Sequence, residues 1–282
     1  MSERLLLCSD LDRTLLPNGL QPESPQARPL LRRLAAHPGM TLAYVSGRHL
    51  ALIEQAIAEY DLPRPQFAVG DVGTSIYRAV GGEWRLWTQW SQHIAADWPG
   101  HSADDLARLF ADIESIALQE PEKQSRFKLS YYADPALDHA ALLADMHRRL
   151  QARGLRASLV WSVDETTATG LLDVLPASAT KLGAVRFLMA ELGVDETHTL
   201  FAGDSGNDLP VLTSGIPAVL VANAIPEVRE EAEWAAQEAG HADRLYVARG
   251  GFLGMNGNYA AGVLEGLAYF HPQWADRLAA AS

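Results

Sequence analysis

The sequence predicts an α/β protein in which a doubly wound, Rossmann-like parallel sheet is interrupted by an inserted α+β module. Short apolar runs alternate with helical patterns at both ends of the chain, which is typical of a parallel sheet. The middle of the chain instead shows short runs separated by turn residues, which indicates antiparallel strands. We expect residues 1–84 and 173–282 to form the core and residues 85–172 the module.

Composition limits the classes of protein that this chain can belong to. Its 282 residues, 48% of them hydrophobic, can bury a large core and suggest two domains. A net charge of -12 argues against non-specific nucleic-acid binding, and it requires any phosphate site to be locally positive. The single cysteine, Cys8, cannot form an internal disulfide and is expected to be buried. We see no signal peptide or membrane span, so we expect a cytoplasmic protein.

The first part of the chain alternates strands with helices. An apolar run at 5–8 is typical of a strand buried on both faces. Leucine spacing predicts a helix over 25–36, and a second buried strand is expected at 40–45. A helix over 49–60 and a third strand at 67–70 complete the strand–helix alternation, which predicts parallel strands.

The module and the return to the core follow from weaker patterns. Residues 76–87 suggest a hairpin around Gly81-Gly82. In the module we expect helices near 103–118 and 136–153 and strands near 126–132, 156–161 and 170–174. In the second half of the core we expect helices at 181–192, from 209, at 226–239 and at 259–270, and strands at 199–202 and 218–221.

Two carboxylates lie where the first strand ends. Asp10 directly follows the strand, and Asp12 comes two positions later, so both side chains point the same way on an extended backbone. Open α/β sheets bind ligands at this carboxyl edge. Like charges so close raise each other's pKa unless a cation joins them. The pair therefore predicts a hard metal ion, a shared proton, or both.

Three further segments are expected at the same edge: Ser46, Lys181 and the run GDSGND, which contains Asp204 and Asp208. Alone, Ser46 could be a helix N-cap and Lys181 a solvated helix residue. Together the aspartates offer the oxygen ligands that Mg²⁺ prefers. The serine hydroxyl and a lysine at a helix start offer donors to an anion. This set predicts a cradle for phosphoryl transfer.

These four segments resemble the four motifs of the haloacid dehalogenase superfamily, and the module resembles its type IIB cap. Over nearly the whole chain the order of segments is similar to that of the sucrose-6-phosphate phosphatase family. The segments that carry the resemblance are SDLDRT, AYVSGR, AVGDVGTSIY, FKLSYY, GLLDVLPASATK, GDSGND, VANAIPE and AGVLEGLAYF.

The resemblance implies roles for the motif residues. Asp10 would be the nucleophile that forms an aspartyl-phosphate, and Asp12 the general acid and base. Ser46 and Lys181 would bind the transferring phosphoryl group. The ligands of Mg²⁺, the implied cofactor, would be Asp10, Asp12 through its carbonyl, Asp204 and Asp208. Arg13 departs from the family, which usually has Asn or Gly there, and we expect it to point outward.

The resemblance implies substrate contacts with less detail. With the phosphoryl-binding pair included, the residues expected to bind substrate are Ser46, Gly47, Arg48, Thr74, Lys128, Lys181 and Asn207. Lys128 is the strongest candidate in the cap, because the FKLSYY segment resembles one that contacts substrate in the family. Five of the seven tryptophans lie at 84–161 and could face a sugar, although aromatic residues more often fill a core.

The resemblance implies a Mg²⁺-dependent phosphatase acting on a phosphorylated disaccharide, most simply sucrose 6-phosphate. Sister phosphatases for mannosylfructose phosphate or a glycosyl-phosphoglycerate are alternatives, since a few cap residues could separate them. A phosphomannomutase and a non-catalytic sugar-phosphate-binding module are two further alternatives. The expected partners are a sugar phosphate and, as a protein partner, a sugar-phosphate synthase, with no nucleic acid and no membrane.

Overall fold

The computed structural model describes residues 4–164 and 168–279. The chain forms two compact units, Met1–Leu86 with Lys181–Ser282 and, inserted between them, Trp87–Thr180. The boundary expected at 172 falls inside strand β9 (Thr169–Pro176). This strand pairs with β8 (Ala157–Asp164) as far as Pro176, so the inserted unit extends beyond the expected end.

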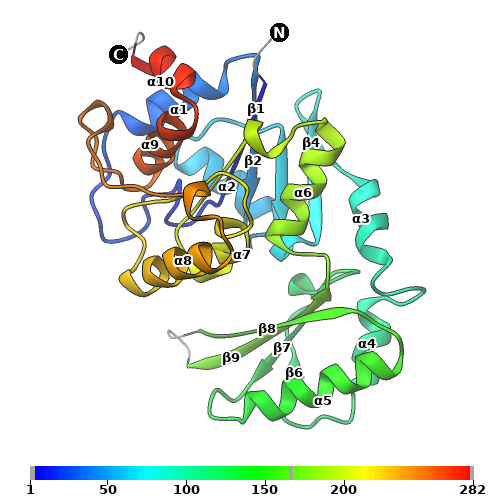
Figure 1. Ribbon diagram of the computed structural model, residues 1–282. Helices are drawn as coiled ribbons and strands as arrows, with labels where there is room; N and C mark the ends of the chain where they lie inside the picture. The colour runs from blue at the N-terminus through cyan, green and yellow to red at the C-terminus, as the bar shows by residue number, and fades with distance from the viewer. Residues whose placement is uncertain (1–3, 165–167, 280–282) are drawn as a thin grey trace. The chain divides into compact units, whose positions relative to one another are not determined.

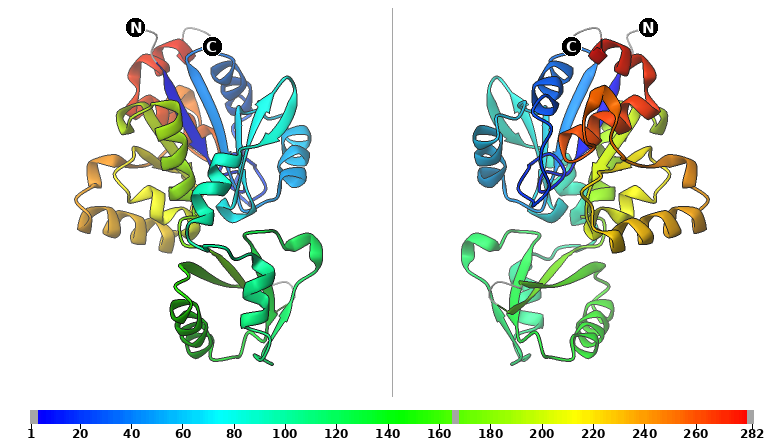
Figure 2. Two further views of the ribbon diagram at one scale, coloured as in Figure 1. Left: turned by 90° about the vertical axis from the view of Figure 1, so that its right-hand side faces the viewer. Right: turned by 90° about the vertical axis from the view of Figure 1, so that its left-hand side faces the viewer.

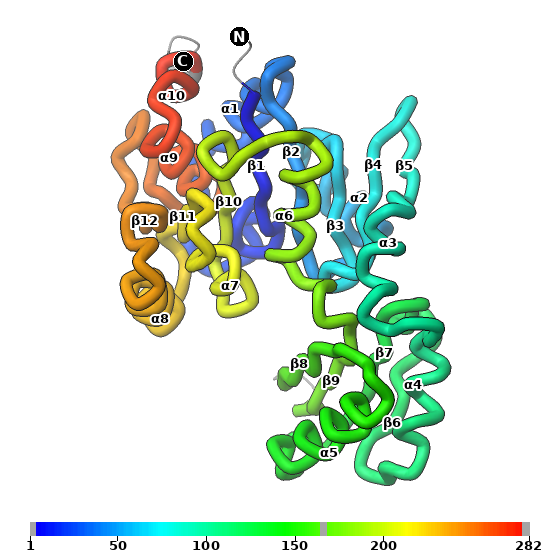
Figure 3. The backbone as a smooth tube through the Cα atoms, turned by 45° about the vertical axis from the view of Figure 1, so that its right-hand side comes forward, coloured from blue at the N-terminus to red at the C-terminus, as the bar shows by residue number. Residues whose placement is uncertain are grey.

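The core unit is built on an eight-stranded sheet with the order β12-β11-β10-β1-β2-β3-β4-β5, which can be followed across Figure 3. The six strands from β12 to β3 are parallel, and β4 and β5 are antiparallel. Their bounds are β1 Leu5–Ser9, β2 Met40–Val45, β3 Phe67–Gly70, β4 Ser75–Val80, β5 Glu83–Leu86, β10 Thr199–Gly203, β11 Ala218–Leu220 and β12 Leu245–Val247. The predicted parallel sheet is confirmed.

Helices cover both faces of this sheet, because the chain leaves β1 in one direction and β10 in the other. Right-handed crossovers then place the connecting helices on opposite faces. Strands β1 and β2 lie between α9 and α6 in Figure 1, and Figure 2 views these two faces in turn. One face carries α1 (Ala27–Ala35), α2 (Leu50–Glu59) and α9 (Ala260–Phe270), and the other α6 (Lys181–Leu192), α7 (Leu209–Leu212) and α8 (Pro226–Glu238).

Burial in the core follows the predicted patterns. All five residues of β1 are buried, including Cys8, and burial raises the pKa of its thiol. On α1 the buried side chains are at the helical spacing of Leu30, Leu31 and Leu34, which pack into the same apolar cluster as α9. In the core unit two elements were not predicted, β12 and a final helix α10 (Pro272–Ala279) that packs on α9.

The inserted unit is a four-stranded antiparallel sheet, of order β6-β7-β9-β8, with helices. Its remaining elements are α3 (Thr88–Ala95), α4 (Ala103–Leu109), β6 (Ile116–Leu118), β7 (Leu129–Ala133) and α5 (His139–Ala152). The expected helix over 103–118 is wrong beyond Leu109, because residues 116–118 pair with β7 as an edge strand. Helix α3 was missed. Within the described part of the chain, no helix is both long and apolar enough to cross a membrane.

Helix α9 lies so close to β11 that its glycine at 266 has no room for a side chain. We expect Gly266→Ala to lower the free energy of unfolding by about 1–3 kcal/mol, the usual cost of overpacking. A Cβ at 266 would lie 2.4 Å from the Cβ of Val219. Alanine favours a helix over glycine by about 1 kcal/mol, so the expected loss is a packing effect.

Urea unfolding of Gly266→Ala and the wild type measures this difference. Gly206→Ala is the matched control, because nothing lies within 4 Å of a Cβ built there. If Gly266→Ala were as stable as the wild type, the close packing of α9 on β11 would be contradicted.

Candidate active site

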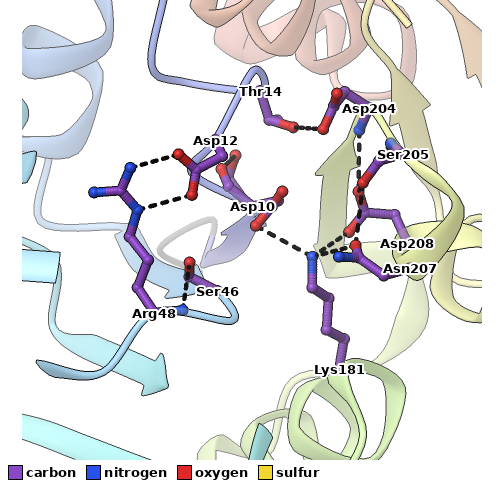
Figure 4. Close-up of polar contacts among 11 residues, drawn as sticks. Asp10, Asp12, Thr14, Ser46, Arg48, Lys181, Asp204, Ser205, Asn207 and Asp208 are labelled. Atoms are coloured by element: carbon purple, nitrogen blue, oxygen red, sulfur yellow. Dashed lines mark hydrogen bonds and ion pairs between the residues drawn. The ribbon is translucent and has the colours of Figure 1, made fainter. Parts of the chain in front are cut away.

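The ends of three neighbouring strands bring the motif residues together. Asp10 follows β1, Ser46 follows β2 on one side of it, and Asp204 follows β10 on the other. The ladder continues one residue beyond β1 and β2, because the Asp10 amide donates to Ala202 O at 2.9 Å and the Ser46 amide to Val69 O at 2.9 Å. The parallel register therefore sets the spacing of these side chains, which point into one site (Figure 4).

Three carboxylates form a compact acidic cluster. The oxygens of Asp10, Asp204 and Asp208 all lie within 4.8 Å of one another, and all three residues are buried. Asp208 accepts hydrogen bonds from the amides of Asp204 and Ser205 at 3.1 and 3.2 Å. Thr14 donates its hydroxyl to Asp204 at 3.2 Å. The cluster supplies hard oxygen ligands that could hold a divalent cation.

Glycine makes this arrangement possible at the end of β10. A Cβ at Gly203 would lie 2.5 Å from Cγ of Asp208. Any other residue would therefore displace the Asp208 carboxylate, which turns back under the strand to bond Asp204. The two glycines of GDSGND thus have different roles, since a Cβ at Gly206 would meet nothing within 4 Å.

Lys181 is the buried cation of the site. It is the first residue of α6, and its Nζ lies 3.1 Å from Asp10, 2.7 Å from Asp208 and 2.7 Å from Oδ1 of Asn207. Burial lowers the pKa of Lys181, but the attraction of the two carboxylates outweighs it and holds the pKa above its ordinary value. The lysine is therefore charged throughout the neutral range.

One lysine does not balance three carboxylates. Burial, partly offset by Lys181 and reinforced by Asp208, raises the pKa of Asp10 to about 7. Burial and the charge of Asp208 raise the pKa of Asp204 to about 6. Both values are for the protein without a metal ion, and both describe a site that binds protons near neutrality when no further cation is present. The donor set and its surplus charge fit a divalent cation.

Asp12 has its own cationic partner. Arg48 donates from Nε to Oδ2 at 2.8 Å and pairs with Oδ1 at 2.5 Å, and Asn18 donates to Oδ1 at 2.8 Å. Burial raises the pKa of Asp12, but the hydrogen bonds from Arg48 and Asn18 outweigh it and lower the pKa below its ordinary value. The contact of Asn18 with Asp12 was not predicted, and only the closeness of the two residues in the sequence could have suggested it.

The expectation that Arg13 points outward is wrong. Its Nε lies 3.5 Å from Oδ2 of Asp204, and the side chain lines the pocket. Asp204 attracts the guanidinium because Lys181 is already shared by Asp10 and Asp208. The arginine therefore adds a second positive charge beside the acidic cluster.

These residues surround a pocket of about 340 Å³. It is lined by Asp10, Asp12, Arg13, Ser46, Gly47, Arg48, Asp204, Ser205 and Asn207. Three residues expected to bind substrate are not among these lining residues. Lys181 is buried against Asp10 and Asp208, Thr74 is buried with its hydroxyl donating to Asp71 O at 2.9 Å, and Lys128 belongs to the inserted unit. The pocket therefore combines arginines with hard oxygen donors, and its substrate contacts stay predictions.

The chain is similar to known proteins over nearly its whole length. The family model described as sucrose-6F-phosphate phosphohydrolase matches residues 3–271. A Nitrosococcus oceani protein described as a HAD-like hydrolase is 60% identical over 273 residues, which are 97% of this chain and 73% of that protein. The mannosylfructose-phosphate phosphatase of Agrobacterium fabrum is 29% identical over 270 residues, which are 94% of this chain and 96% of that protein.

A solved structure extends the similarity to three dimensions. The sucrose-phosphatase of Synechocystis, determined in complex with sucrose and phosphate, is similar with a TM-score of 0.71 and 26% identity. The match covers 95% of this chain and 98% of the other. Both the core and the inserted unit therefore have counterparts in that structure.

The charge surplus predicts that a cation stabilises the protein more at high pH than at low pH. The raised pKa values of Asp10 and Asp204 mean that their protonated forms favour folding. Their contribution to the free energy of unfolding is fully present at pH values below the ordinary pKa of a carboxyl group. It is lost as pH rises through about 6 to 7, the raised pKa values. Adding Mg²⁺ at pH 8 should raise the unfolding midpoint by about 4 °C or more, equivalent to roughly 1–2 kcal/mol in a chain of this size.

Thermal unfolding with EDTA or Mg²⁺, at pH 5 and pH 8, measures the effect. At pH 5 the shift should be much smaller, because the carboxyls bind protons in place of the metal. Asp204→Asn is the control and should reduce the shift at pH 8. A Mg²⁺ shift of the same size at both pH values would contradict the assigned charge balance.

Proposed function

The chain belongs to the sucrose-6F-phosphate phosphohydrolase family of sugar phosphatases, and from this premise we propose that it hydrolyses sucrose 6-phosphate to sucrose and phosphate. The observation that carries the proposal is the cradle at three adjacent strand ends, where the carboxylate of Asp10 lies beside Lys181 and Ser46. The sucrose-phosphatase of Synechocystis supports the choice of sugar.

In the proposed reaction an oxygen of Asp10 attacks phosphorus while the bond from phosphorus to the sugar oxygen breaks. Asp12 donates a proton to the departing sugar oxygen. Water then attacks the aspartyl-phosphate, gives its proton to Asp12 and releases phosphate. Before the first step the ion pair of Asp12 with Arg48 has to open, since a paired carboxylate is not an acid.

Positive charge is needed around the phosphoryl group throughout. Lys181, the hydroxyl of Ser46 and the guanidinium of Arg48 would bind the phosphoryl oxygens, with the backbone at Gly47 and the amide of Asn207 beside them. Mg²⁺ would be held by Asp10, Asp204, Asp208 and the carbonyl of Asp12. When bound it would offset the charge that the phosphoryl group adds to the acidic cluster.

One face of the sheet in the inserted unit carries polar side chains, of which Lys128 and Tyr132 are partly exposed and Ser130 is buried. Leu129 and Tyr131 of β7 are buried, and by alternation Lys128, Ser130 and Tyr132 belong to the opposite face. There Ser130 donates its hydroxyl to Asp173 of β9. Among the described residues Lys128 has no ion-pair partner, so its ammonium is available to a hydroxyl or phosphate group. We infer that this face carries Lys128 as a substrate contact.

The alternative functions differ in the product that each would release. A mannosylfructose phosphate or glycosyl-phosphoglycerate phosphatase would also release phosphate but prefer its own substrate. A phosphomannomutase would isomerise a sugar phosphate without net release. A non-catalytic binding module would do neither, and the complete set of Asp10, Asp12, Lys181 and Asp204 argues against it. A synthase that makes the phosphorylated disaccharide, as partner, and a cytoplasmic location remain proposals.

Phosphate release in the presence of Mg²⁺ tests the substrate. The panel is sucrose 6-phosphate, mannosylfructose phosphate, glucosyl-phosphoglycerate, glucose 6-phosphate and mannose 6-phosphate. We expect kcat/KM for sucrose 6-phosphate to exceed the others by about 100-fold, a transition-state difference of roughly 2.7 kcal/mol. Flat, weak activity on all five would leave a phosphatase without the sucrose assignment.

Asp10→Asn is the catalytic control for this assay. It keeps the shape of the nucleophile but removes the charge that attacks phosphorus, so turnover should be abolished while circular dichroism is unchanged. EDTA should also abolish release. An Asp10→Asn protein with full activity would rule out the aspartyl-phosphate mechanism.

Lys128→Ala tests the proposed sugar contact. We expect kcat/KM for sucrose 6-phosphate to fall by about 10- to 100-fold, the effect of one lost charge-assisted hydrogen bond. Hydrolysis of p-nitrophenyl phosphate, which has no sugar, should be unchanged. Lys123→Ala is the matched control on the same unit, because Lys123 already contacts Glu120 and Tyr132. Equal losses on both substrates would contradict a sugar-specific role.

A further inference from the structure

A buried asparagine connects the catalytic loop after β1 to the C-terminal part of the core. Asn223 lies just beyond β11, the strand next to β10, and is 2% exposed. Its Nδ2 donates to the carbonyl of Arg13 at 2.6 Å, and its Oδ1 accepts from the amide of Tyr259 at 2.8 Å. Because a carbonyl only accepts and an amide only donates, these two partners determine the orientation of the carboxamide.

Both backbone partners of Asn223 are in strained conformations. Arg13 has φ of 56° and Tyr259 has φ of 52° with ψ of -135°, a region that residues other than glycine rarely adopt. Such conformations persist only where the surrounding contacts hold them. Tyr259 is itself anchored, since it is fully buried and its hydroxyl donates to Gln21 O at 3.1 Å. Asn223 therefore ties a strained catalytic loop to a fixed point.

The hydrogen bond from Asn223 to Arg13 lies next to the reacting groups. Arg13 directly follows Asp12, whose carboxylate is proposed to protonate the departing sugar oxygen. The loop after β1 is also held by the amide of Arg13, which donates to Oδ1 of Asn18 at 2.8 Å. Without the Asn223 bond the Arg13 carbonyl would lose this donor, and the left-handed turn would be free to relax.

We infer that Asn223 is a positioning residue for the general acid: its carboxamide holds the Arg13 peptide so that Asp12 is placed to protonate the leaving group. This inference rests on the proposed phosphatase function. If it holds, replacing Asn223 lowers kcat/KM by a factor that depends on the leaving group. Only a leaving group that needs a proton is sensitive to the position of Asp12.

The test is Asn223→Asp, assayed with sucrose 6-phosphate and with p-nitrophenyl phosphate. Asp has nearly the same shape and still accepts from Tyr259, but it cannot donate to Arg13 O. We expect kcat/KM to fall by about 100-fold with sucrose 6-phosphate and by less than about fivefold with p-nitrophenyl phosphate, whose nitrophenolate leaves without protonation. Equal losses, or no loss, would overturn the inference.

Asn258→Asp is the matched control. Asn258 makes an equivalent bond from the C-terminal segment, with its Nδ2 donating to Pro22 O at 3.0 Å, but it does not contact Arg13. Its kcat/KM should equal that of the wild type with both substrates. Asn223→Ala, which avoids two facing oxygens, is measured in the same way if Asn223→Asp does not fold. If neither variant folds, the role is structural and the inference is wrong.

Asp12→Asn separates this inference from the function on which it rests. The variant should show the same leaving-group dependence as Asn223→Asp, but larger. If Asp12→Asn lowers kcat/KM, which reports the step in which the leaving group departs, equally for both substrates, or if the wild type releases no phosphate, the proposed mechanism has failed. If only Asn223→Asp lacks the dependence, the mechanism stands and the positioning role is wrong.

Discussion

Three buried carboxylates beside a single buried lysine are the constraint on which the rest of the site depends. Asp10, Asp204 and Asp208 have oxygens within 4.8 Å of one another, and Lys181 contacts two of them. The pKa values of about 7 for Asp10 and about 6 for Asp204 record the surplus of negative charge. A fold that brings these groups out of water is stable only because protons, or a cation, complete the balance. The chemistry of the site follows from the same imbalance, since a group of carboxylates that needs cations can also bind a phosphoryl group through them.

The sheet topology creates this concentration of charge. The chain leaves β1 toward β2 and returns later through β10 on the other side, so the ends of β2, β1 and β10 are neighbours. Residues far apart in the sequence are thereby placed a few ångströms apart, as in the 3.2 Å bond between Thr14 and Asp204. Glycine at 203 permits the closest approach, because a side chain there would collide with Asp208. The side chain of Asn223, just beyond the neighbouring strand β11, donates to the carbonyl of Arg13 in the loop after β1.

Much of the fold could be predicted because burial leaves a pattern in the sequence. The apolar run before Asp10, the leucine spacing of α1 and the strand–helix alternation were confirmed by buried side chains in β1 and α1. The two strands that were not predicted share one cause. Strand β6 was predicted as part of a helix and β12 was missed, because each has only three residues and exists through pairing with one neighbour. Local propensity contains no information about such a partner.

The sequence by itself determined the fold class, the order of the motif segments and the residue types that the chemistry needs, because each is expressed in a short contiguous stretch such as GDSGND. Tertiary structure decided how those groups share their charges. Lys181 bonds Asp10 and Asp208, Arg48 neutralises Asp12, and Arg13, expected to point outward, approaches Asp204. These pairings depend on distances between side chains from different strands, and no local pattern encodes them. For the same reason the roles of Asn18 and Asn223 could not be predicted. They depend on the atoms that the folded chain places within hydrogen-bonding distance, the Asp12 carboxylate and the Arg13 carbonyl.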